Sequence, residues 1–283
     1  MLIQVLFEGL AMGAIYALIA MGIALVWGVM NILSFSQGEF MMLAMYLTFF
    51  LNLKLGLDPI ASLPLVMVAL FILGVIVYKL LISRALRGPV LSQRLITFAL
   101  GMVLINIMLM QVGGQYWKVQ DLLFTGSVEL GFMTLSKQKL VPIAVSLIVT
   151  ALLFLFMNRT KTGKSISATA QDKDAAGLMG INTEKAYMIA FGISSAIAGA
   201  AGCSLTYYYY ISPSVGVPFL IFGFIAVCLG GFGSIFGAFV GGVIMGLVDL
   251  FTGTYLSVSY KYLAVILIFM LIVSFKPKGL FGR

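Results

Sequence analysis

Residues 8–28 of the chain read EGLAMGAIYALIAMGIALVWG, an apolar run whose one charged residue stands at its start. About 20 consecutive apolar residues are enough to cross the hydrocarbon core of a bilayer as an α-helix. Small residues recur along the run at helical spacing, namely Gly9, Gly13, Ala17, Ala20 and Ala24. Because small side chains at that spacing let helix backbones approach closely, the run predicts a membrane-spanning helix inside a bundle.

The composition of the whole chain agrees with this prediction. Of its 283 residues, 62% are hydrophobic and 9% are charged, whereas a soluble domain averages about 25% charged residues. So few charges could not cover a surface that faces water, so we expect an integral membrane protein. The chain has no His, and its two cysteines, Cys203 and Cys228, stand apart in apolar runs. We therefore expect neither a metal site nor a disulfide framework.

Nine apolar segments are candidate membrane spans, at residues 3–27, 37–57, 60–82, 95–113, 140–157, 187–210, 218–231, 234–252 and 259–275. The first lacks the basic region and cleavage site of a signal peptide, so we interpret it as a span. The sequence thus predicts an all-α, polytopic membrane protein with eight or nine transmembrane helices in one domain over residues 1–283. Where a segment holds polar residues, a broken or re-entrant helix is the alternative to a full crossing.

Basic residues gather in three segments that hold eleven of the 17 Lys and Arg residues. They are Arg84, Arg87 and Arg94; then Arg159, Lys161, Lys164, Lys173 and Lys185; and finally Lys276, Lys278 and Arg283. Because cytoplasmic loops are rich in Lys and Arg, we place these segments and the C-terminus in the cytoplasm. Residues 114–139 then form an external loop. The N-terminus lies outside if all nine segments cross, which we favour, and inside if 37–57 is re-entrant.

This topology accounts for the net charge of +8, so we expect a lipid bilayer and no nucleic acid as a partner. Three of the four ionisable residues within apolar runs, Glu8, Asp249 and Lys261, stand near predicted span ends. We expect their charges to reach water there. The fourth, Glu39, is the deepest.

Glu39 belongs to a polar cluster with the sequence SFSQGE at residues 34–39. Ionisable groups within a membrane are costly and often functional. We predict that this cluster belongs to the translocation path or its gate, with a structural break in the helix as the alternative. The candidate residues are Ser34, Ser36, Gln37, Gly38 and Glu39.

A second interruption lies in LGGFGSIFGAFVGGVIMG, residues 229–246. Its glycines predict either a broken helix, as found along substrate paths in transporters, or a tight hairpin between two spans. Both alternatives stay open. The candidate path residues here are Gly230, Gly231, Gly233 and Ser234.

The chain lacks the motif of a nucleotide-binding loop. The stretch RTKTGKS at 159–165 ends like one, but Asn158 stands where the motif requires its first glycine. Grouped Ser, Asp and His residues that would indicate an intramembrane enzyme are missing as well. We therefore expect no catalytic residue and no cofactor in this chain.

Five stretches of the sequence together resemble one family. They are GLAMGAIYALIAMGIALVWGVMNILSFSQGEFMMLAMY (9–46), TGKSISATAQDKDAAGLMGIN (162–182), AFGISSAIAGAAG (190–202), GGFGSIFGAFVGG (230–242) and FKPKGLFGR (275–283). In this order and spacing they resemble the permease subunits of branched-chain amino acid ABC transporters, the LivH type. Two departures concern the polar cluster: Gln37 replaces the usual His and Ser34 the usual Asn. An Arg usual near residues 166–168 is also absent.

The resemblance implies a permease domain with the fold of an ABC importer subunit in the inner (cytoplasmic) membrane of a prokaryote. It implies four kinds of partner: two ATP-binding subunits that hold ATP and Mg²⁺, a second permease that is related or identical, a solute-binding protein, and a small amino acid as substrate. Relatives also move urea and short amides, so the substrate stays open within the family. A self-sufficient channel or secondary transporter, coupled through Glu39, is the rival from another class.

The resemblance also gives residues 159–186 a function, as a cytoplasmic loop that couples to an ATP-binding subunit. We expect a short helix here, capped by Ser165 or Ser167, with a solvated loop between helices as the alternative. Its small apolar face toward the partner would consist of Ala168, Ala170, Ala175, Ala176, Leu178 and Met179. Asp172, Lys173 and Asp174 would face water. The candidate coupling residues are Lys164, Ser165, Ala168, Asp172, Asp174, Ala175, Gly177, Met179 and Gly180.

Overall fold

The computed structural model describes residues 2–120, 122–124, 126–129, 134–276 and 279–282. Within these residues, seven helices are long and apolar enough to cross a membrane, and two apolar helices are shorter. The long helices are α1 (Leu2–Met30), α2 (Gln37–Leu55), α3 (Pro59–Val77), α5 (Val90–Val112), α6 (Leu140–Arg159), α9 (Thr183–Leu205) and α11 (Ile235–Tyr255). The short ones are α10 (Gly216–Gly230) and α12 (Lys261–Phe275). These nine helices coincide with the nine predicted segments and confirm the all-α fold class.

Smaller elements join these helices. A π-helical turn, η1 (Tyr78–Ile82), and α4 (Ser83–Ala85) continue α3 without interruption, and the turns η2 (Lys137–Lys139) and η3 (Val258–Tyr260) precede α6 and α12. Two short helices, α7 (Lys161–Gln171) and α8 (Lys173–Leu178), connect α6 to α9. A short antiparallel hairpin of β1 (Ser127–Glu129) and β2 (Thr134–Ser136) lies in the predicted external loop.

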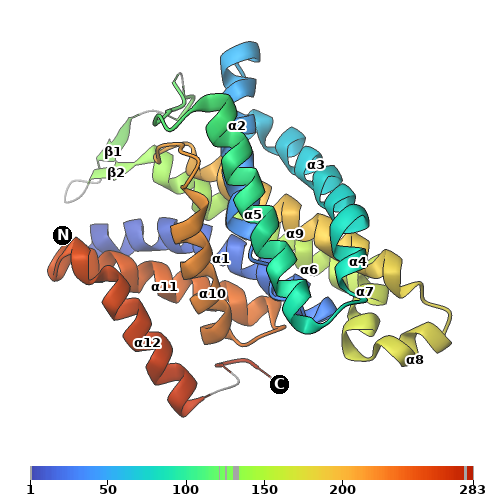
Figure 1. The fold of residues 1–283 in the computed structure, drawn as a ribbon. Helices are drawn as coiled ribbons and strands as arrows, with labels where there is room; N and C mark the ends of the chain where they lie inside the picture. The colour runs from blue at the N-terminus through green and yellow to red at the C-terminus, as the bar shows by residue number, and fades with distance from the viewer. Residues whose placement is uncertain (1, 121, 125, 130–133, 277–278, 283) are drawn as a thin grey trace.

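The helices form two halves of similar arrangement and opposite direction (Figure 1). The first half holds α1, α2, α3 and α5, and the second holds α9, α10, α11 and α12. Helix α1 packs along α11, and in the same way α9 packs along α3. Likewise α1 contacts α10 as α9 contacts α2. This exchange of partners is the pattern of an inverted repeat, an arrangement common in membrane transporters.

Glycines make the contact between α1 and α11 close. A Cβ on Gly13 would lie 2.9 Å from the backbone Cα and O of Val243, and one on Gly9 would lie 3.1 Å from the Cα of Leu247. Between α9 and α3, Ser195 fills the space that Gly74 leaves open. The small residues predicted to serve helix packing therefore do so.

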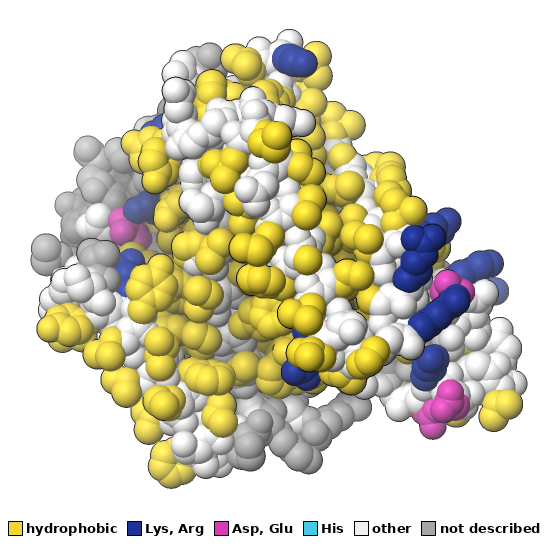
Figure 2. Space-filling view, viewed as in Figure 1, with side chains coloured by type: hydrophobic (Ala, Val, Ile, Leu, Met, Phe, Trp, Pro, Cys, Tyr) yellow, Lys and Arg dark blue, Asp and Glu magenta, His cyan; other side chains and the backbone are white. Residues whose placement is uncertain are grey.

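The described parts of the three basic segments meet at one end of the bundle, which we call the basic end. The connection after α3 and the start of α9 lie there together, since η1 contacts α9. Helix α7, the 231–234 turn and the C-terminal Phe281 also line one cavity there. Figure 2 shows Lys and Arg gathered over α4, α7 and α8 beside a mainly apolar face. The prediction that these segments share one side is confirmed.

The N-terminus lies at the opposite end. Glu8 forms an ion pair of 2.7 Å with Lys139, which stands at the start of α6, and α6 runs from there to Arg159 at the basic end. The two termini are therefore on different sides, which agrees with the favoured prediction of nine crossings. Glu8 is partly exposed, as expected of a charge near a span end.

Two helices begin inside the bundle and not at its surface. Gln37, the first residue of α2, bonds to Ser194 near the middle of α9, and Gly216, the first residue of α10, touches Gly38. At about 1.5 Å per residue, the 15 residues of α10 span about 22 Å, less than the hydrocarbon core of about 30 Å. The predicted segment 37–57 begins inside the bundle, so the crossing is completed by the irregular backbone at 31–36 that leads into it.

The predicted span 187–210 ends too late. Helix α9 stops at Leu205, and the chain then turns back into the bundle. Two tertiary contacts fix this turn: the Tyr207 hydroxyl donates a hydrogen bond to Asp58, and Ile211 pairs with the backbone of Trp117 at 2.8 and 2.9 Å. The apolar sequence continues beyond the helix, so its composition could not reveal the end.

Candidate functional site

The polar cluster 34–39 is buried where helices of both halves meet. Gln37 Nε2 donates hydrogen bonds of 2.7 Å to both the carbonyl oxygen and Oγ of Ser194, and Ser194 Oγ donates to the carbonyl of Gly22 at 2.8 Å. Ser34 and Ser36 lie within hydrogen-bond distance of each other, at 3.3 Å. The cluster thus ties the start of α2 to α1 and α9.

Glu39 points from the same turn of α2 toward α5. A Cβ on Gly101 would lie 3.2 Å from the carboxyl carbon of Glu39 and 3.3 Å from its Oε2. Gly101 is the middle residue of α5, so the carboxyl group lies near the middle of the membrane. Its side chain is 4% exposed. Among the described residues, Glu39 Oε2 and Gln37 Oε1 have no hydrogen-bond partner.

Gly38 brings the first turns of α2 and α10 into contact. A Cβ on either Gly38 or Gly216 would overlap the backbone of the other. Neither helix has a side-chain cap at its N-terminus, so both first turns present backbone N–H groups at mid-membrane depth. The structure therefore places all five residues of the first predicted path at one site.

The second predicted path lies elsewhere, at the basic end. The chain makes a tight turn at Gly231 and Gly233, which have φ values of 105° and 81°, and α11 begins after Ser234 caps Gly237 N. This turn joins α10 to α11, and the two helices pack against each other. Of the two alternatives, the hairpin is the one observed. Gly230, Gly231, Gly233 and Ser234 do not join the polar cluster.

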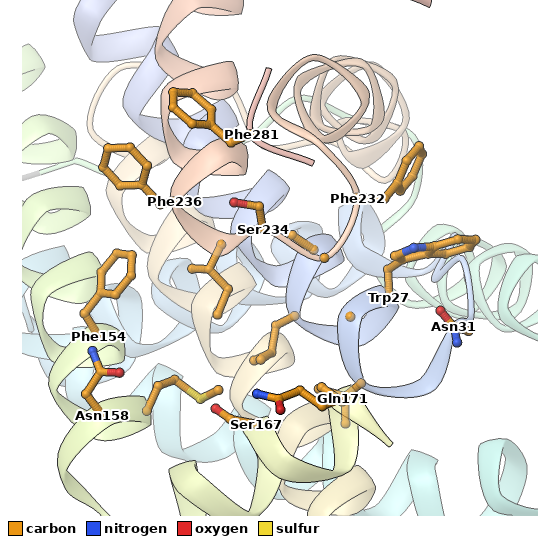
Figure 3. A pocket seen from close by; sticks show the side chains of 18 residues that line it. Trp27, Asn31, Phe154, Asn158, Ser167, Gln171, Phe232, Ser234, Phe236 and Phe281 are labelled. Carbon is orange, nitrogen blue, oxygen red and sulfur yellow. The ribbon is translucent and has the colours of Figure 1, made fainter. Parts of the chain in front are cut away.

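A cavity of about 720 Å³ opens beside this turn (Figure 3). Helices α1, α6 and α7 and the C-terminal Phe281 complete its wall. Trp27 and Phe232 lie on one side of it, and the amides of Asn158 and Gln171 lie on another. The cavity therefore lies between the predicted coupling segment and the transmembrane helices.

The predicted coupling segment consists of two helices whose caps differ from our expectation. Thr160 Oγ1 accepts a hydrogen bond from Gly163 N and caps α7, and Asp172 Oδ1 accepts from Asp174 N and Ala175 N and caps α8. Ser165 and Ser167 lie inside α7, so the prediction that one of them caps the helix is wrong. The chain changes direction at Thr160, between α6 and α7, and the cap of α7 lies at that bend.

Helix α8 ends in a Schellman motif. Gly180 has a φ of 80°, its N–H bonds to Gly177, and Ile181 N–H bonds to Ala176. Ala176 is 5% exposed within this chain, so the prediction that it faces a partner is wrong. Leu178 and Met179, which were predicted on the same apolar face, are 89% and 83% exposed, and Asp172, Lys173 and Asp174 are exposed as predicted. The tip of the segment is apolar and uncovered in this chain.

The sequence of residues 5–275 matches the family model described as branched-chain amino acid transport system / permease component. The chain belongs to this family. It is 31% identical over 294 residues to the high-affinity branched-chain amino acid transport system permease protein LivH of Salmonella typhimurium, covering 99% of this chain and 96% of that protein. It is also 31% identical over 297 residues to BraD of Pseudomonas aeruginosa, again covering 99% and 96%.

A solved structure shares the fold of this permease. PsaBC from Streptococcus pneumoniae in complex with Fab matches with a TM-score of 0.53 at 13% identity, covering 96% of this chain and 91% of that chain. The family confirms the predicted resemblance and the prediction of a transport component rather than an enzyme.

The permease buries one ionisable group that the sequence predicted to be accessible to water. Asp249 is 2% exposed, accepts a hydrogen bond of 3.0 Å from the Tyr16 hydroxyl and pairs with Lys261 at 3.2 Å. The expectation that Asp249 reaches water near a span end is therefore wrong. The position of Asp249 near the end of α11 predicted an accessible charge. It did not indicate that residues of α1 and α12 would pack over the carboxyl group.

Proposed function

We propose that this chain is the membrane-spanning permease subunit of an ABC importer for branched-chain or other apolar amino acids. The observation that supports this most is the full-length match to permeases of such systems, together with an exposed apolar tip at the basic end. The chain forms the translocation path, and separate subunits bind and hydrolyse ATP with Mg²⁺.

The tip of α8 is the surface on which an ATP-binding subunit docks. Leu178 and Met179 stand out from a short helix whose other side is closed by Ala176. Large exposed apolar side chains at the end of a rigid motif are typical anchors for a partner. The charged residues Asp172, Lys173 and Asp174 form the rim, and the whole segment lies in the cytoplasm by the distribution of Lys and Arg.

The importer needs three further components. A second permease, related or identical, completes the path, and a second ATP-binding subunit docks on it. A solute-binding protein delivers the amino acid at the end opposite the basic segments, where residues 114–120, 206–211 and 253–260 lie. The protein resides in the cytoplasmic membrane of a prokaryote with its C-terminus inside.

Affinity purification in mild detergent, followed by mass spectrometry, tests this function. We expect the wild-type chain to retain an ATP-binding subunit and the Leu178→Asp variant to lose it while remaining folded. Leu53→Asp is the matched control, since Leu53 is also an exposed leucine, 66% accessible, at the far end of α2. Retention by both variants would refute the docking surface.

Uptake into proteoliposomes that contain the complete complex identifies the solute. We expect ATP-dependent accumulation of leucine, isoleucine or valine. Accumulation of urea or short amides instead would identify a permease of the same family with another substrate. Uptake by the purified chain alone, driven by an ion gradient without ATP, would refute the proposed function in favour of a secondary transporter.

A further inference from the structure

We propose that Glu39 forms a site at mid-membrane depth that binds the ammonium group of the amino acid during transport. This inference rests on the proposed function, because it assumes that an amino acid passes through the bundle. It concerns a site that is closed in the present conformation, where α5 covers Glu39.

The second half of the molecule provides an internal control for the fold. Gly38 and Gly216 contact each other reciprocally, so they are equivalent positions of the inverted repeat. The residues before and after Gly216 are Val215 and Val217, where the first half has Gln37 and Glu39. The second half therefore builds the same mid-membrane helix start without a carboxyl or amide group. The polar pair is not a requirement of the architecture.

The polar pair is also costly where it stands. Only 4% of Glu39 is exposed, and its Oε2 has no hydrogen-bond partner among the described residues. Gln37 Oε1 is likewise buried without a partner, although its Nε2 is fully used. Unpaired acceptors at this depth destabilise the fold, and such groups in membranes mark substrate or ion sites. The free atom of Glu39 is a carboxyl oxygen, so the missing ligand is a hydrogen-bond donor.

The helix that covers Glu39 is weakly attached to the bundle. Of the 23 residues of α5, only Thr97, Leu100, Gly101 and Met108 are buried, whereas 17 of the 23 residues of α9 are. Two hydrogen bonds of Thr97 attach α5 to the backbone before the cluster: Phe35 N donates to Thr97 Oγ1 at 3.3 Å, and Thr97 Oγ1 donates to the carbonyl of Leu33 at 3.2 Å. Gly101 covers the carboxyl group with backbone alone. A small displacement of α5 would therefore uncover Glu39 without unpacking the core.

An amino acid has groups that match the uncovered site. Its ammonium group donates to the Glu39 carboxylate, which gives a charge-assisted pair in a medium of low polarity. Its carboxylate is favoured near the uncapped N–H groups at the start of α10, because helix N-termini attract anions. No covalent bond changes in this step.

The test compares transport with stability in the complete reconstituted complex. Glu39→Val introduces the residue that the second half has at the equivalent position, and Glu39→Gln keeps the shape without the charge. We expect both variants to assemble and to resist unfolding at least as well as wild type, while leucine uptake falls at least tenfold. Glu8→Gln, a control at the partly exposed ion pair with Lys139, should change uptake less than twofold.

A structural role of Glu39 would give a different result, since stability and uptake would fall together. That outcome, or unchanged uptake in both variants, would overturn the inference. A wild-type complex that accumulates no amino acid would instead refute the proposed function, so the two failures are distinguishable.

Ligand chemistry is tested by saturation-transfer NMR on the wild-type complex in nanodiscs. We expect leucine to give a methyl signal that leucinol, which keeps the ammonium group, displaces and N-acetylleucine, which lacks it, does not. The leucine signal should disappear in Glu39→Gln. Equal displacement by both compounds, or a wild-type complex without a leucine signal, would overturn the ammonium site.

Discussion

Replacing Gly13 by Ala tests whether the close contact of α1 and α11 holds the two halves together. The added Cβ would lie 2.9 Å from the Cα and O of Val243, whereas ordinary contacts begin at 3.4 Å, so the helices must separate by about 3.4 − 2.9 = 0.5 Å. Both obstructing atoms are backbone and cannot rotate away. A gap of about 0.5 Å already forfeits about a quarter of the dispersion energy of the contacts that it opens.

This overpacking should destabilise the protein by about 1–3 kcal/mol, offset by about 0.5–1 kcal/mol because Ala is a better helix residue than Gly. The midpoints of these two ranges give a net loss of about 2 − 0.75 ≈ 1.3 kcal/mol, or about 8-fold in the folding equilibrium. Gly177→Ala is the matched control, since nothing lies within 4 Å of the new Cβ in helix α8. It should leave stability unchanged or raise it.

The assay follows a buried thiol. In a Cys228→Ala background, Cys203 is the remaining cysteine, and it is 1% exposed in the fold. A dye that fluoresces on reaction with thiols reports unfolding in detergent as a rate at fixed temperature, which suits a membrane protein that unfolds irreversibly. If Gly13→Ala unfolds no faster than its background, or as slowly as Gly177→Ala, the reasoning from close backbone contact is refuted.

Three further predictions concern polar contacts. Lys261→Met should destabilise the protein by about 2 kcal/mol or more, because it leaves Asp249 buried and unpaired; this is less than for a fully buried pair, since Lys261 is 24% exposed. The double variant Lys261→Met/Asp249→Asn should regain most of the loss in the thiol assay. Thr160→Ala removes the cap of α7 and should cost about 1 kcal/mol, whereas Ser165→Ala, inside the same helix, should cost less. Burial, and then the hydrogen bond to Asp58, raise the pKa of the Tyr207 hydroxyl, which lies outside the spanning helices. The stability that this contact gives is complete below about pH 10 and falls as the pH rises further. The difference in stability between wild type and Tyr207→Phe should therefore shrink above about pH 10. A difference that stays constant with pH would contradict this prediction.

The length and polarity of runs were readable from the sequence because they are local properties. Apolar runs near 20 residues identified all nine helices, and Lys and Arg identified the segments that share one end. Glycines that end a helix with positive φ, such as Gly180, were also predictable, because backbone conformation there depends on the residue itself. The start of α9 at Asn182 and the cap at Thr160 were not found, since several polar residues compete in that loop.

Contacts between distant residues were beyond the sequence. Gln37 and Ser194 are 157 residues apart, and Tyr16 and Asp249 are 233 residues apart. The composition around Asp249 predicted an accessible charge, and the tertiary structure buried it. The same reason explains why the two predicted paths separated: both were polar or Gly-rich interruptions, but only one lies where the two halves meet.

By itself the sequence determined that this chain is a helical membrane protein, which segments span, and which residues are too polar for their surroundings. Those outcomes follow from the free energy of transferring each residue between water and lipid, which is a sum over neighbours in sequence. Only the tertiary structure decided the depth of Gln37 and Glu39, the reciprocal contact of Gly38 with Gly216, and the exposure of Leu178 and Met179. These depend on which helices pack together and in which direction, and that arrangement is fixed by close contacts between residues far apart in the chain.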